Sequence, residues 1–124
     1  MRVFRDKYLF NQSKVTPMSQ TAILEKLREE LRKIEENLTR LELEKKKIDE
    51  EYSAVLDEEN KILEEMKKCR DQYQYIRLEM RFNTVSRRRK EIEARKTEIE
   101  RKIRGYGEEK SKIQRRIEYL KPRS

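Results

Sequence analysis

Apolar residues recur along most of the chain with the alternating spacing of three and four that is typical of a coiled-coil helix. From Leu24 this heptad pattern runs without a slip for about 60 residues. Fifteen of its eighteen a and d positions are apolar, and the other three are Lys45, Glu59 and Asn83. The pattern predicts one long helix over residues 17–82, with Thr16 as its N-cap and proline at its first position.

A second heptad frame occupies the last third of the chain, offset by two residues from the first. Its d positions begin at Val85 and its a positions at Arg89. The residues at the offset are weak helix formers, so we expect a turn or phase break at 83–86. A second helix is predicted over 87–121, because the proline that follows cannot continue it, and residues 122–124 form a tail. Gly105 and Gly107 should destabilise this helix locally without interrupting it with a loop.

The fold class is therefore all-α, and two arrangements of the helices fit the pattern. One is a continuous helical rod in a parallel coiled coil, and the other is an antiparallel helical hairpin folded near residue 82. The parallel dimer would bring Glu44 against Asp49, whereas the folded register brings Glu79 against Arg88. Flanking charges select helix orientation, so the hairpin is favoured and the rod is kept as the alternative.

The folded register makes specific pairings across the hairpin. It places Tyr52 opposite Ile113 and Cys69 opposite Lys96. Cys69 is at a d position and is expected to be a small core residue. Polar core positions such as Glu59 reduce stability and fix the pairing of helices.

The same register leaves residues 24–41 without a partner inside the chain, since the second helix reaches back only to about residue 45. An apolar stripe left exposed on a helix should associate with another chain. Glutamates flank this stripe and would repel a second copy in parallel, so a heteromeric coiled-coil partner is expected. The predicted partner-binding zipper consists of Leu24, Leu27, Leu31, Ile34, Leu38 and Leu41.

Charge is distributed unevenly along the chain. Charged residues make up 47% of the sequence and the net charge is +8, of which residues 84–124 carry 15 basic against 7 acidic groups. Such a basic end can bind acidic surfaces, including tubulin. Nucleic acid is a less favoured partner, because Glu91 and Glu93 would face its phosphates. The predicted basic patch consists of Arg87, Arg88, Arg89 and Lys90.

Residues 1–16 precede the heptads and show no sustained period. Aromatic residues are only 7% of the chain, yet several are concentrated here. We expect an extended arm that docks its apolar side chains on a neighbouring surface. The predicted anchors are Phe4, Tyr8, Leu9 and Phe10.

Several function classes are disfavoured by composition. The chain has no histidine and one cysteine, so the commonest general base and the usual zinc ligand sets are missing. We expect no enzyme activity, no cofactor and no metal. No apolar run approaches the roughly 18 residues of a membrane span, so a cytoplasmic, cytoskeletal location is expected, with the nucleus as the alternative.

The overall composition resembles that of coiled-coil subunits of cytoskeletal assemblies, such as axonemes, centrosomes and kinetochores. The resemblance implies a non-enzymatic structural subunit that binds partner helices through its heptad stripes. Its arm and basic end would then contact neighbouring surfaces. The alternative function is an electrostatic module that binds acidic polymers, either nucleic acid or the microtubule surface, through residues 84–124.

Overall fold

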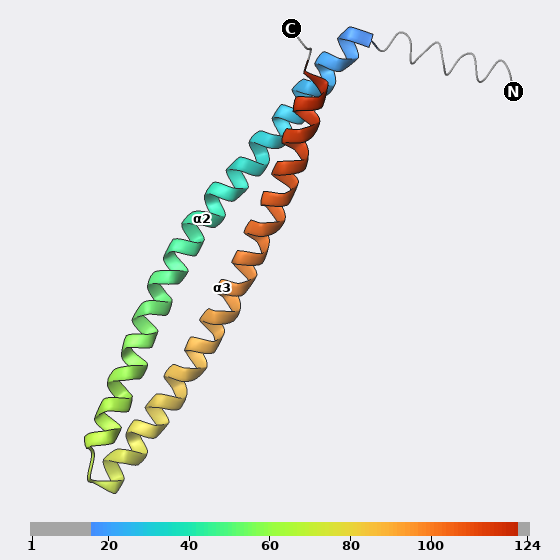
Figure 1. The fold of residues 1–124 in the computed structure, drawn as a ribbon. Helices are drawn as coiled ribbons and strands as arrows, with labels where there is room; N and C mark the ends of the chain where they lie inside the picture. The colour runs from blue at the N-terminus through green and yellow to red at the C-terminus, as the bar shows by residue number, and fades with distance from the viewer. Residues whose placement is uncertain (1–15, 122–124) are drawn as a thin grey trace, which may run out of the picture. The chain divides into compact units, whose positions relative to one another are not determined.

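The computed structural model describes residues 16–121, and this part of the chain contains two helices and no strand. Helix α2 spans Thr16–Lys68 and helix α3 spans Gln72–Leu120. The two helices pack against each other as a helical hairpin (Figure 1). The predicted all-α hairpin is therefore confirmed, and the continuous rod is wrong. The predicted arm, with Phe4, Tyr8, Leu9 and Phe10, lies outside the described residues.

The turn lies at residues 69–71, and not at the predicted 83–86, which are helical. Asp71 begins α3 as an N-cap, because its Oδ1 accepts a hydrogen bond from the backbone N–H of Tyr73 at 3.1 Å. The last turn of α2 contains two lysines, where positive charge interacts favourably with the helix dipole. The turn at 69–71 thus contains no glycine, and no residue of the described chain has a positive φ.

The weak helix formers at 83–86 are accommodated inside α3. The hydroxyl of Thr84 donates a hydrogen bond to the carbonyl of Met80 at 3.1 Å, which a threonine can do within a helix. The second heptad frame also begins earlier than predicted, since Leu78 and Phe82 are half-buried in phase with buried Val85. The heptad frame therefore changes at the turn, and not at residues 83–86.

Two compact units divide the helices between them. In the described chain, the first unit comprises residues 16–38 and 106–121. Its core is the cluster of Leu24, Leu27 and Ile117, against which Leu31, Ile113 and Leu120 pack. The prediction of a free partner-binding zipper is wrong, because α3 reaches this segment and covers it. Of the six zipper residues, Leu24, Leu27, Ile34 and Leu41 are buried, and Leu31 and Leu38 are half-buried.

The second unit, residues 39–105, contains the turn and its own core. Its buried side chains recur every seventh residue on each helix, at the d positions of the two frames. A fully buried side chain of this size contributes about 1.5–3 kcal/mol to stability. The core residues of this unit are Leu41, Ile48, Val55, Ile62, Val85, Ile92 and Ile99.

Candidate interaction surfaces

A polar network joins the two helices within the second unit. The Arg89 guanidinium contacts the Glu59 carboxylate at 2.6 Å through Nε and the Glu93 carboxylate at 2.7 Å through Nη1. The hydroxyl of Tyr52 donates a hydrogen bond to the same Glu93 oxygen at 2.9 Å. The hydrogen bonds from Arg89 and Tyr52 lower the pKa of Glu93, and the bond to Glu93 raises the pKa of Tyr52.

A second ion pair, between Lys96 and Asp49, lies next to this network. The ammonium of Lys96 lies 3.1 Å from Asp49 Oδ1 and 4.9 Å from the centre of the Tyr52 ring. The hydrogen bond to Asp49 raises the pKa of Lys96. In the first unit, Lys110 approaches Glu35 at 3.8 Å. Each lysine at a charged a position of α3 therefore lies beside a carboxylate of α2.

These contacts overturn the predicted register. Lys96 lies at Asp49 instead of Cys69, and Tyr52 contacts Glu93 instead of Ile113. The register has moved by about three heptads, which preserves the facing stripes but changes every pair. The physical reason is that the predicted register set the charged a positions of the second helix against apolar groups, and an unpaired buried charge is costly.

The predicted basic patch is divided by this arrangement. Arg89 is committed to the contact with α2, and its side chain is 22% exposed. Arg87, Arg88 and Lys90 are exposed on α3. Three of the four residues thus remain accessible to an acidic partner.

An apolar surface that the sequence did not single out lies on α3 just after the turn. Tyr73, Ile76 and Met80 are 72%, 51% and 66% exposed. Their spacing of three and four places them on one face of the helix, and their exposure shows that this face does not pack on α2. We call these three residues the turn-end face. They match the first heptad frame, so the sequence pattern predicted them as core.

A groove adjoins the turn-end face and holds about 900 Å³. It is lined by the last turn of α2, the turn and the start of α3. Cys69 lines it, half-buried, and its thiol donates to the Asp71 carbonyl at 3.2 Å, so the prediction of a core cysteine is wrong. Basic side chains outnumber acidic ones in the lining, which includes Lys68, Arg70, Arg77 and Arg81 beside Glu65 and Asp71.

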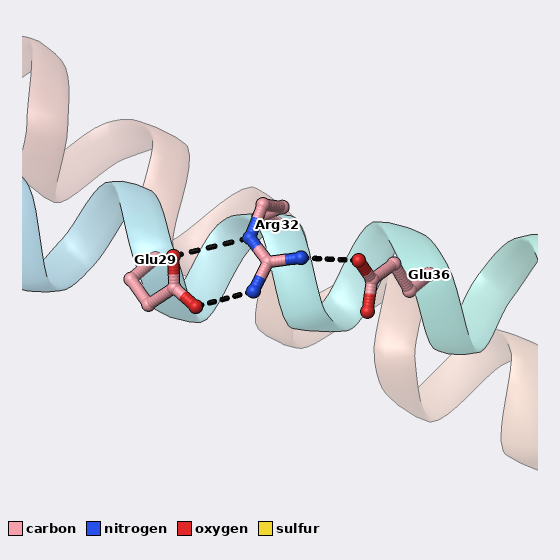
Figure 2. Close-up of polar contacts among 3 residues, drawn as sticks. All are labelled: Glu29, Arg32 and Glu36. Carbon is pink, nitrogen blue, oxygen red and sulfur yellow. Dashed lines mark hydrogen bonds and ion pairs between the residues drawn. The ribbon is translucent and has the colours of Figure 1, made fainter.

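Elsewhere between residues 19 and 121, the exposed surface is polar or carries only single apolar groups. Figure 2 shows Arg32 bridging Glu29 and Glu36 along α2. Its Nε and Nη2 lie 3.1 and 2.5 Å from the two Glu29 oxygens, and the hydrogen bond from Arg32 lowers the pKa of Glu29. Such exposed pairs along a helix stabilise it slightly and leave these groups satisfied. Exposed Leu43 and Tyr119 lie singly, as is normal for protein surfaces.

No cluster of three or more side chains that could hold a metal ion occurs between residues 16 and 121. Over the same residues, neither helix is both long enough and apolar enough to cross a bilayer. The chain matches no protein-family model, no curated protein sequence and no solved structure.

Proposed function

We propose that this chain is a non-enzymatic structural coiled-coil subunit of a larger, cytoskeletal-type assembly of the axonemal, centrosomal or kinetochore kind. The observation that carries the proposal is the contrast between the heptad stripes and the turn-end face. The stripes are covered by the hairpin itself, whereas Tyr73, Ile76 and Met80 are left exposed. A hairpin that satisfies its own core can act as a preformed element, and its exposed apolar group then supplies a contact to other proteins.

Partner coiled-coil proteins remain the expected ligands, in a heteromeric and cytoplasmic assembly. The partner helix would not pair with the Leu24–Leu41 stripe, because that stripe is covered by α3. Outward surfaces would make the contacts instead. The arm anchors would add a second contact by docking their apolar side chains on a neighbouring surface.

The basic residues support a second candidate function, an electrostatic module for acidic polymers such as the microtubule surface or nucleic acid. Arg87, Arg88 and Lys90 are exposed in the first half of α3, the half that follows the turn. Residues 67–90 carry nine basic and two acidic side chains. Binding through such charges weakens steeply as salt rises.

The two functions differ in their response to salt. A tagged chain would be expressed in its source cells, extracted with detergent at about 50 and 200 mM salt, and its retention in the insoluble cytoskeletal fraction measured. A structural subunit is retained at both concentrations. An electrostatic module is released at the higher one and loses retention on Arg87→Glu with Arg88→Glu. A chain that is entirely soluble and monomeric at the lower concentration contradicts both.

A further inference from the structure

We propose that the turn-end face and the adjoining groove form a docking site for an acidic amphipathic helix of a partner protein. The inference rests on the proposed structural function and specifies the chemistry of the partner. Tyr73, Ile76 and Met80 have the spacing that a further helix needs to pack along α3. The hairpin core does not require apolar residues at these positions, since more than half of each side chain is exposed.

The contrast along α3 supports a local site. Farther along the helix, exposed positions are mostly charged or polar, as at Arg101, Glu108 and Lys112. The three large apolar side chains are thus confined to about two turns of the helix, immediately after the turn. A confined apolar group of this kind, surrounded by polar residues, is typical of an interaction site.

The charges around this face specify an acidic partner. Arg77 and Arg81 line the groove beside Met80. Lys68, at the end of α2, and Arg70, in the turn, line it as well. Within residues 16–121, none of Arg70, Arg77 and Arg81 forms an ion pair. An entering helix with glutamates beside an apolar stripe would pair with these groups. Its apolar burial would supply affinity, and the charges would set orientation and association rate.

The same charges disfavour other occupants. A second copy would bring the arginines of one face against those of the other, which repel. A bilayer surface would receive only three apolar side chains, less than an interfacial helix normally buries. Nucleic acid bases stack on aromatic rings, whereas two of the three side chains, Ile76 and Met80, are not aromatic.

The test uses the full chain and a synthetic probe. The probe is a fluorescein-labelled peptide of about three heptads, with leucine at a and d and glutamate at e and g. Its glutamates prevent it from pairing with itself. Binding is followed by fluorescence anisotropy at about 150 mM salt. We expect saturable binding, at least about tenfold tighter than that of the same peptide with lysine at e and g.

Two paired substitutions test the two components of the site. Ile76→Glu with Met80→Glu removes the apolar contact, and Arg77→Glu with Arg81→Glu reverses the charge; each should weaken peptide binding at least about tenfold. All four side chains are exposed or at the groove, so the hairpin should persist, as circular dichroism would verify. Tyr119→Glu is the matched control at an exposed site in the other unit, and it should leave binding unchanged.

Three results would overturn the docking site. They are no saturable peptide binding up to about 100 μM, binding that neither paired substitution weakens, and binding to anionic vesicles or a DNA duplex without binding to the peptide. Failure here remains distinct from failure of the structural function. If the chain stays in the cytoskeletal fraction at high salt while the peptide does not bind, another surface makes the assembly contacts.

Discussion

Arg89 and Glu59 meet across the helix pair at 2.6 Å, with side chains that are 22% and 13% exposed. Both occupy a positions, where an apolar residue would pack better. Glu59 is the one acidic residue among the a positions of the first heptad frame, so a shift by whole heptads would leave Arg89 without an acidic a-position partner, which is costly for a partly buried charge. The pair therefore contributes more to the choice of register than to stability, as polar a-position residues do in coiled coils.

The first prediction tests this pair by removing one or both charges. Arg89→Leu leaves Glu59 partly buried and unpaired, so the melting temperature should fall by roughly 5 °C. Adding Glu59→Leu should recover most of the loss, because replacing a whole buried pair with apolar groups is close to neutral. Thermal unfolding followed by circular dichroism measures both.

Arg95→Leu provides the comparison for this prediction. Arg95 contacts Glu51 at 3.4 Å, but the two side chains are 60% and 45% exposed. Exposed pairs contribute little, so the melting temperature should move by less than about 2 °C. Equal shifts for Arg89→Leu and Arg95→Leu would show that the buried pair has no special role.

The second prediction is that the protein loses stability at acidic pH, when the Glu93 carboxylate is protonated. Hydrogen bonds from Arg89 and Tyr52 hold the pKa of Glu93 below its ordinary value of 4.5. Its carboxylate therefore stabilises the fold fully above that ordinary value, which it has in the unfolded chain, and this stabilisation is lost as pH falls through the lower folded pKa. We expect the free energy of unfolding to decline as pH falls below about 4.5.

Tyr52→Phe isolates the contribution of one hydrogen bond to this titration. It should raise the pKa of Glu93 toward the ordinary value while the bond from Arg89 remains. The pKa is measured by NMR titration of the Glu93 side-chain carboxyl. A pKa at or above 4.5 in the unsubstituted protein would contradict the network.

At the scale of a helix, α3 contains two glycines in its interior. Gly105 and Gly107 have ordinary helical backbones without positive φ, and a Cβ added at either would meet no atom within 4 Å. The sequence-based expectation of a helix that continues through them is confirmed. The glycines reduce stability through backbone entropy alone.

The third prediction follows from this open space. Gly105→Ala and Gly107→Ala should each stabilise the protein by about 0.5–1 kcal/mol, because alanine restricts the unfolded chain and meets no clash in the helix. Chemical denaturation measures the gain. Ala94→Gly, at an exposed helical site, is the reverse control and should cost a similar amount. A loss on either glycine substitution would mean that these positions have an unseen packing role.

The position of the turn shows where a periodic pattern misleads. Tyr73, Ile76 and Met80 have the spacing of the heptad frame of α2. The pattern therefore predicted that the first helix continues across residues 69–71, where the structure has the turn. Local signals for the turn were present in the sequence: Asp71 is a good N-cap, and Lys67 and Lys68 suit a helix end. They were outweighed because each is worth about 1 kcal/mol or less, and none includes glycine or proline.

At the scale of the molecule, the hairpin itself could be predicted because flanking charges favour antiparallel pairing. The register could not be predicted from those flanks, since several registers about one heptad apart satisfy them similarly. Matching Arg89 to Glu59 and Lys96 to Asp49 distinguishes among registers, but it requires comparing the core charges of both helices at once. The wrong register also led to the wrong candidate surface. The predicted zipper is covered by α3, and the turn-end face, which is exposed, was predicted to be core.

The last prediction measures the register directly with spin labels at Ser53 and Lys90, both exposed and both in the second unit, after replacing Cys69 with serine. In the observed register, helix axes about 8–10 Å apart place the labels within about 20 Å, linkers included. A turn at 83–86 would separate them along the axis by about 33 Å, and a continuous helix by about 55 Å. Labelled chains are diluted in unlabelled protein, so that only distances within one chain are read. A dominant distance above about 30 Å would contradict the turn at 69–71, and with it the exposure of the turn-end face, because that face is free only when α3 begins at Gln72.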